Sequence, residues 1–157
     1  MNRLILSHRQ KLDNLFARIS SITTPADQSE WSKYLCVLVS GFIEESLRVL
    51  LEEYTKKRAS SNIQNFVEKQ ISNITNCKTS RIIEILGKFS QDWADEFVDQ
   101  IQTKSSMKDE IKNSIDSVIS NRHDIAHGRN VGITYARISA YYSNVKKTIE
   151  ILEDIIQ

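Results

Sequence analysis

The sequence predicts an all-α protein. Apolar residues recur at intervals of three and four along almost the whole chain of 157 residues, which is the spacing of a helix face. The chain contains only one proline and four glycines, so few positions interrupt its helices. No segment shows the alternation of apolar and polar residues that a half-buried strand requires. A single domain, residues 1–157, is expected, with a core that needs no disulfide or structural metal.

The first two helices are expected to be separated at residues 24–27, which read Thr-Pro-Ala-Asp. Threonine is a favoured N-cap and proline fits the first helical turn. This predicts one helix over roughly 3–21 and a second from Pro25 to about Lys57. The second helix is expected to be central because apolar residues lie on several of its sides. They are Tyr34, Leu35, Val37, Leu38, Val39, Phe42, Ile43, Leu47, Val49, Leu50 and Leu51.

The middle of the chain predicts shorter helices. Residues 61–64, Ser-Asn-Ile-Gln, have the form of a capping box and indicate a helix start. Residues 72–80 are polar and indicate a loop. One or two helices with a break near Gly87 are expected from a run of apolar residues at helical spacing, which we assign to the core: Ile82, Ile83, Leu86, Phe89, Trp93, Phe97 and Ile101.

Two long helices are expected at the end of the chain. Residues 106–109 indicate the start of one helix, and Gly128 and Gly132 indicate its end. Thr134 starts the last helix, whose apolar stripe is Ile138, Tyr141, Tyr142, Val145, Ile149, Leu152 and Ile156. The predicted architecture is therefore an antiparallel bundle of four main helices with short additional helices.

Charge and composition exclude several classes of protein. The net charge of +1, from 21 basic and 20 acidic residues, speaks against a chain built to coat DNA or anionic lipid, although contact with a short RNA stays open. Cys36 and Cys77 form no C-x-x-C motif and are expected to be reduced, intracellular thiols. The apolar start at residues 4–6 is too short for a signal peptide or a membrane span, so we expect a cytoplasmic protein.

The most informative segment is 122–127, Arg-His-Asp-Ile-Ala-His, which contains two of the three histidines and is followed by Gly128. Extending the apolar row Ile111, Ile115, Val118 along a helix leads to Arg122, and a charge in that register needs a partner or a function. His123 and His127 lie four residues apart, on one helix face.

These residue types suit metal-free RNA cleavage. Arginine presents a permanently charged donor fork that matches phosphate, and histidine exchanges a proton near neutral pH. Such cleavage needs one group that helps to move the proton of the 2′-hydroxyl and another that protonates the leaving 5′-oxygen. It also needs a fixed cation for the charge that develops on the phosphate oxygens.

The string from Arg122 to His127 resembles the R-x4-6-H motif of the HEPN superfamily, small α-helical domains of which many are metal-independent endoribonucleases. His123 stands where that family most often has asparagine. The layout looks most like the RiboL-PSP type of HEPN domain, a resemblance that covers nearly the whole chain. It rests on residues 41–45 (Gly-Phe-Ile-Glu-Glu), the run Leu86, Phe89, Trp93, Phe97, and residues 121–128.

The resemblance implies an RNA substrate, no cofactor or metal, and products with 2′,3′-cyclic phosphate and 5′-hydroxyl ends. Arg122 would stabilise the scissile phosphate, His127 would act as general acid or base, and His123 would orient the phosphate or ribose. Asp124 is a supporting candidate. The resemblance also implies a homodimer that brings two motifs to one cleft, and a toxin–antitoxin or antiphage defence setting with a cognate antitoxin or defence partner.

Either Glu44 or Glu45 is expected to support the site, and the sequence leaves the choice open. Glu45 interrupts the apolar row Leu38, Phe42, Val49, whereas Glu44 matches the resemblance better but stands four residues before Arg48, with which it can pair.

Other interpretations also stay open. The domain can be a non-catalytic module for dimerisation or RNA binding, or Arg122, His123 and His127 can simply be cations at a helix end. A zinc hydrolase built on His123-Asp124-x-x-His127 is a further alternative, although no third ligand stands out. His8 is expected to lie on the surface.

Overall fold

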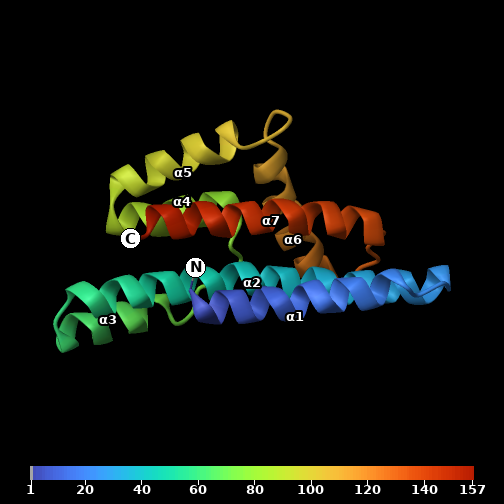
Figure 1. Cartoon of the computed structure of the whole chain (residues 1–157), viewed down its shortest axis with the longest axis horizontal. Coiled ribbons are helices and arrows are strands. Elements are labelled where there is room, and N and C mark those ends of the chain that lie inside the picture. The colour runs from blue at the N-terminus through green and yellow to red at the C-terminus, as the bar shows by residue number, and fades with distance from the viewer. Residues whose placement is uncertain (1) are drawn as a thin grey trace.

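The computed structural model describes residues 2–157, which form seven α-helices and no strand. The helices are α1 (Arg3–Ser20), α2 (Pro25–Arg58), α3 (Ser61–Ile71), α4 (Thr79–Phe89), α5 (Gln91–Thr103), α6 (Glu110–Ala126) and α7 (Tyr135–Ile155). The predicted all-α helical bundle is confirmed. Figure 1 shows α1, α2 and α7 lying lengthwise, with α5 beside α7 and α6 crossing behind it, and α4 packs against α5.

Helix α2 is the central element, as its apolar residues predict. It packs against α1, α3, α6 and α7, and residues on several of its sides are fully buried, among them Leu35, Phe42 and Leu51. Side-chain contacts give the directions of its neighbours. Phe16 of α1 stacks on Tyr142 of α7 at 4.5 Å between ring centroids, and Arg9 of α1 pairs with Glu150 of α7. Helix α1 therefore runs antiparallel to α7.

Most helix boundaries agree with the sequence within two or three residues. Thr134 is the N-cap of α7, and its hydroxyl accepts a hydrogen bond from the N–H of Arg137. The predicted break near Gly87 falls at Ser90, which separates α4 from α5. The predicted capping box is wrong, because Ser60 is the N-cap of α3 and makes no side-chain cap bond. Instead, the side-chain amide of Gln64 donates to the carbonyl of Ala59.

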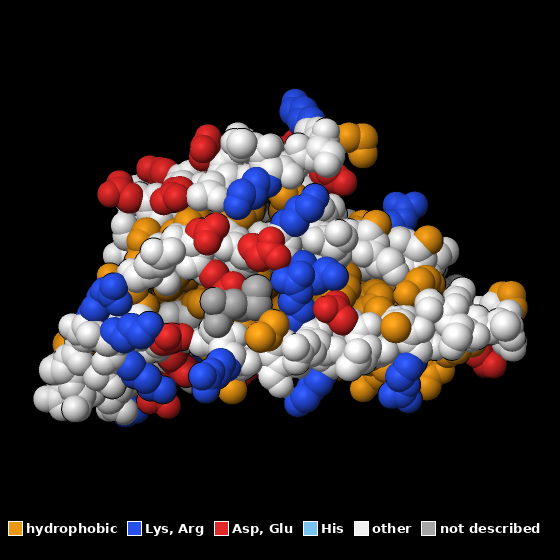
Figure 2. Space-filling model, in the orientation of Figure 1, with side chains coloured by type: hydrophobic (Ala, Val, Ile, Leu, Met, Phe, Trp, Pro, Cys, Tyr) orange, Lys and Arg blue, Asp and Glu red, His pale blue; other side chains and the backbone are white. Residues whose placement is uncertain are grey.

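The charged residues are distributed unevenly over the surface. Figure 2 shows acidic side chains gathered over α5, where four carboxylates are exposed: Asp92, Asp95, Glu96 and Asp99. None of the four forms an ion pair with a described residue. A polyanion such as RNA is repelled from this face, so an RNA site is expected elsewhere. Within residues 2–157, no helix combines the length and the apolar composition needed to cross a lipid bilayer.

Candidate active site

Arg122 lies just before the last turn of α6 and is half-buried. Three residues along the predicted row, Ile111, Ile115 and Val118, are completely buried and hold this face of α6 against the core. The thiol of Cys36 in α2 donates to the carbonyl oxygen of Val118 at 3.5 Å. Among residues 2–157, no side chain forms a hydrogen bond or ion pair with the guanidinium of Arg122. The donor fork is thus free to bind an anion.

His123 and His127 are both exposed and lie side by side at the end of α6. Their ring centroids are 4.3 Å apart, with 54° between the ring planes. The helix ends because Gly128 adopts a left-handed conformation with φ of 68°. The N–H of Gly128 donates to the carbonyl of Ile125 and the N–H of Arg129 to that of Asp124, which is a Schellman motif. This turn holds His127 at the helix terminus, where its ring is open to solvent.

Asp124 forms an ion pair with a nearby arginine. Its Oδ1 accepts from the guanidinium of Arg129 at 2.8 Å, so its charge is already paired. In the zinc alternative, Asp124 would be the base and the two histidines would be ligands. The described part of the chain contains no group of three or more His, Cys, Asp and Glu side chains able to hold a metal ion, so that alternative gains no third protein ligand.

The structure distinguishes the two acids of α2. Glu45 accepts two hydrogen bonds from the guanidinium of Arg48 and lines a surface pocket together with His8 of α1. Glu44 is half-buried, and its Oε1 accepts from the backbone N–H of Asn76 at 3.1 Å. Burial raises the pKa of Glu44 above its ordinary value of 4.5, and the hydrogen bond from Asn76 and the positive charge of Arg122 act in the opposite direction. Of the two acids, Glu44 is therefore the one whose pKa is affected by the charge of Arg122.

Replacing Glu44 with glutamine is expected to stabilise the protein at neutral pH. A carboxyl whose pKa is raised on folding binds its proton more tightly in the folded state, so stability falls as pH rises above 4.5. Because Glu44 is half-exposed, the gain of Glu44→Gln at pH 7 is below about 1 kcal/mol, and it vanishes near pH 4.

Urea denaturation of the variant and the wild type at the two pH values measures this difference. Glu45→Gln is the matched control, and it gains no stability because it loses the ion pair with Arg48. A Glu44→Gln protein that is less stable at pH 7 would show that the carboxylate and Arg122 form a net stabilising pair.

The cysteines are excluded as nucleophiles. Cys36 and Cys77 are free and completely buried. Burial raises the pKa of each thiol to about 12, and for Cys77 the charge of Glu44 adds to the effect. The nucleophilic thiolate is accordingly absent at neutral pH. The expectation for His8 is wrong, since His8 is half-buried, packs edge-on against Phe42 at 4.9 Å, and has a pKa lowered mainly by burial.

An apolar strip on α2 was not expected from the sequence. Trp31, Tyr34 and Val37 are 44%, 49% and 36% exposed, although the pattern predicts that Tyr34 and Val37 are buried. The rings of Trp31 and Tyr34 meet edge to face at 5.7 Å. Continuing this helix face by seven residues from Val37 leads to Glu44, so the strip runs toward the motif.

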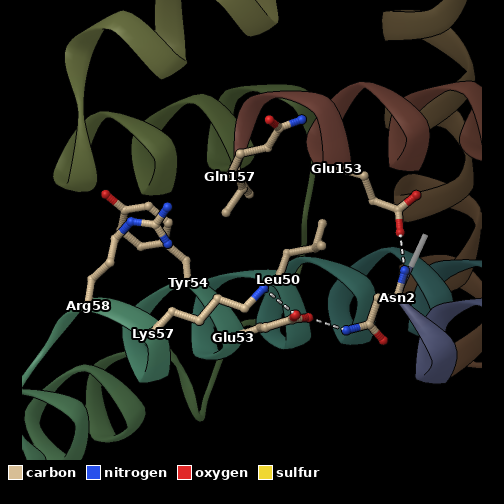
Figure 3. Close-up of a pocket in the computed structure, with 9 residues that line it drawn as sticks. Asn2, Leu50, Glu53, Tyr54, Lys57, Arg58, Glu153 and Gln157 are labelled. Atoms are coloured by element: carbon tan, nitrogen blue, oxygen red, sulfur yellow. Dashed lines mark hydrogen bonds and ion pairs between the residues drawn. The ribbon is translucent and has the colours of Figure 1, made fainter.

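A separate hollow lies at the other end of α2. Tyr54, Lys57 and Arg58 are among the residues that line a pocket of about 340 Å³, and Figure 3 shows their side chains. Its charged groups already interact with one another: Lys57 pairs with Glu53 at 2.7 Å, and Arg58 lies over the ring of Tyr54 at 4.4 Å. Few charged groups of this pocket are therefore free to bind a ligand, and the candidate site remains the end of α6.

The all-α bundle, with Arg122 and His127 at the end of its sixth helix, has the layout expected of a HEPN-type domain. The family model of RiboL-PSP-HEPN matches residues 4–157, and the chain belongs to that family. Neither a curated protein nor a solved structure matches this chain. Membership places the protein among RNase or RNA-binding modules.

Proposed function

We propose that this protein is a metal-independent endoribonuclease in which Arg122 and His127 act on the scissile phosphate. The observation that carries the proposal is a half-buried arginine without a protein partner, placed one and a half turns before an exposed histidine at the helix terminus. A buried-register cation without a partner is costly in a purely structural role. We also propose that residues 1–157 act as one domain, since all seven helices contribute to one connected core.

The proposed reaction is an internal transfer at phosphorus. The 2′-oxygen bonds to the phosphorus atom while the bond to the 5′-oxygen breaks, so a 2′,3′-cyclic phosphate and a 5′-hydroxyl form. One histidine takes the proton of the 2′-hydroxyl and another gives a proton to the leaving oxygen. Arg122 stabilises the charge that develops on the non-bridging oxygens. His123, in contact with His127, orients the phosphate or the ribose.

Glu44 supports this site as a positioning residue. Its carboxylate is fixed by the N–H of Asn76 and its charge acts on Arg122. In the proposed role, the carboxylate of Glu44 holds the guanidinium of Arg122 by its charge and leaves the donors of Arg122 free for the phosphate, because the two side chains form no direct ion pair.

The site is proposed to be completed by a second copy of the chain. In one chain, the rings of His123 and His127 lie together at the end of one helix, with centroids 4.3 Å apart, whereas the reaction needs an acid and a base at opposite sides of the phosphate. The apolar strip Trp31, Tyr34 and Val37 is exposed on the α2 face that leads to Glu44. Burying this strip in a two-fold contact, with α6 near the axis, supplies the hydrophobic driving force for a dimer.

Val37→Glu is expected to convert a dimer into a monomer and to abolish cleavage, because the contact would bury an unpaired carboxylate. Light scattering at micromolar concentration measures the mass of each protein. Ile63→Glu is the matched control, since Ile63 lies on α3 and is 52% exposed, and this variant remains dimeric. A wild-type monomer that cleaves RNA would refute the shared site.

Cleavage of single-stranded RNA in the presence of EDTA tests the proposed activity. The purified protein is expected to cleave under these conditions, and a requirement for added zinc or magnesium would contradict the mechanism. Binding of RNA without cleavage would instead identify a non-catalytic module. A toxin–antitoxin or defence role, with a cognate antitoxin or defence partner, forms part of the proposal and rests on the family alone.

A further inference from the structure

A groove lies between α3 and α4, on a part of the chain that contributes no residue to the end of α6. The groove encloses about 380 Å³. Apolar side chains make up most of its lining: Phe66, Val67, Ile71, Ile74, Ile85 and Phe89. Apolar surface that stays in contact with water costs free energy, and a bound partner recovers it. The groove is therefore a candidate binding surface.

The apolar wall on α3 extends beyond the groove itself. Phe66 is 60% exposed, and Ile63, one turn earlier on the same helix face, is 52% exposed although it does not line the groove. Gln70 does line it, so the wall runs over seven residues of α3, or roughly 10 Å. A small molecule confined to the groove would leave Ile63 uncovered. An elongated occupant would cover the whole wall.

The wall on α4 carries positive charge at both ends. Arg81, Ile85 and Lys88 line the groove at spacings of four and three residues, so they form one row that is roughly 10 Å long. No carboxylate of the described residues lines the groove. The two cations share a single acid, Glu84, which is exposed and lies outside the lining. Exposed pairs of this kind are weak, so both cations are able to pair with acids of an occupant.

The two walls fit an α-helix better than an extended peptide. An extended peptide needs hydrogen-bond partners for its backbone, and the apolar side chains between α3 and α4 offer none. A helix satisfies its own backbone and can place an apolar face in such a groove. Two acids seven residues apart on that helix have the same spacing as Arg81 and Lys88. The groove therefore matches an amphipathic helix with acids beside its apolar face.

The acidic helix of this chain, α5, does not have the required face. None of its exposed residues is apolar, and three of its apolar residues are buried in the core: Ala94, Phe97 and Ile101. If α5 of a second copy lay against the groove, it would bring acids without apolar side chains to cover Phe66. The matching helix is therefore sought in another protein.

We propose that the groove between α3 and α4 binds an acidic amphipathic helix of a partner protein. The apolar face of that helix packs against Phe66 and Ile85, and two of its acids pair with Arg81 and Lys88. This surface is independent of the proposed RNA cleavage, because it uses none of the residues at the end of α6.

Fluorescence anisotropy with a synthetic peptide tests this surface. The probe is a labelled helical peptide of about 18 residues, with leucines along one face and two glutamates seven residues apart beside that face. It is expected to bind the wild-type protein saturably, with a dissociation constant of about 100 μM or lower. The same peptide with lysines in place of the two glutamates should bind at least about tenfold more weakly.

Variants of the groove test its two walls separately. Phe66→Ala should weaken binding of the glutamate peptide about tenfold. Leu4→Ala is the matched control, because Leu4 is 67% exposed on α1, and it should bind as the wild type does. The double variant Arg81→Glu with Lys88→Glu should reverse the preference, so that the lysine peptide binds at least about tenfold more tightly than the glutamate peptide. Thermal unfolding confirms that each variant is folded.

Five results would overturn the proposal: no saturable binding up to about 1 mM, equal binding of the two peptides, equal weakening by Phe66→Ala and Leu4→Ala, displacement of the peptide by single-stranded RNA, or a lower protein mass in Phe66→Ala by light scattering. Displacement would assign the groove to RNA, and the lower mass would assign it to a second copy of the chain. None of these measurements depends on RNA cleavage, so failure of one proposal leaves the other intact.

Discussion

Alanine in place of either Arg122 or His127 is expected to lower the rate of RNA cleavage by about 10²- to 10⁴-fold. In the proposed mechanism, Arg122→Ala removes the cation that stabilises the phosphate in the transition state, and His127→Ala removes a proton-transfer group. Cleavage of a labelled single-stranded RNA in EDTA measures both effects. Arg3→Ala is the matched control, because Arg3 is exposed at the start of α1 and forms no ion pair with a described residue.

The stability of these two variants separates a catalytic role from a structural one. His127 is exposed at a helix terminus, so His127→Ala should change the free energy of unfolding by less than about 1 kcal/mol. Arg122→Ala should be neutral or stabilising, because in a two-fold cleft it removes two nearby like charges. If Arg122→Ala instead lowers the free energy of unfolding by roughly 3–5 kcal/mol and also abolishes cleavage, Arg122 belongs to a structural network with Glu44.

Phe42→Ala is expected to cost about 3–5 kcal/mol of unfolding free energy, the largest stability effect that we predict. Phe42 is completely buried in α2 and touches two other helices. Its ring lies 4.9 Å from that of His8 in α1 and 6.4 Å from that of Tyr142 in α7. Removing the ring leaves a cavity where three helices meet, and the rigid bundle refills it only in part.

Denaturant unfolding compares Phe42→Ala with Phe66→Ala, the same chemical change on the exposed side of α3. Phe66 is 60% exposed, so its removal should cost less than about 0.5 kcal/mol. If the alanine variant does not fold, Phe42→Leu replaces it in the comparison. Leucine keeps the site apolar, so this variant should fold with an intermediate loss of unfolding free energy. Equal midpoints for the two alanine variants would contradict the central position of Phe42.

Local signals in the sequence predict much of this fold. Thr134 caps α7 and Gly128 ends α6 because each acts within one helical turn. The row Ile111, Ile115, Val118 predicts the buried face of α6 and hence the register of Arg122. The start of α3 was misplaced because Ser60 and Ser61 are adjacent residues of equal capping preference.

The choice between Glu44 and Glu45 depends on tertiary packing and has no local signal. Adjacent residues on a helix differ by about 100° in direction, and each acid fits a reasonable face of α2. The choice is made by the N–H of Asn76, which lies 32 residues away in sequence, and by the position of α6. The exposure of Tyr34 and Val37 also depends on tertiary packing. Apolar residues of α2 lie on several of its sides, but the neighbouring helices cover only part of its surface.

The ends of the RNA fragments test the proposed site most directly. A 5′-labelled RNA is incubated with the protein in EDTA, and the new termini are identified chemically. Internal transfer through Arg122 and His127 predicts a 2′,3′-cyclic phosphate on one fragment and a 5′-hydroxyl on the other, and no cleavage at a 2′-deoxy position. Fragments with a 3′-hydroxyl and a 5′-phosphate, or cleavage of an all-deoxy strand, would contradict the account.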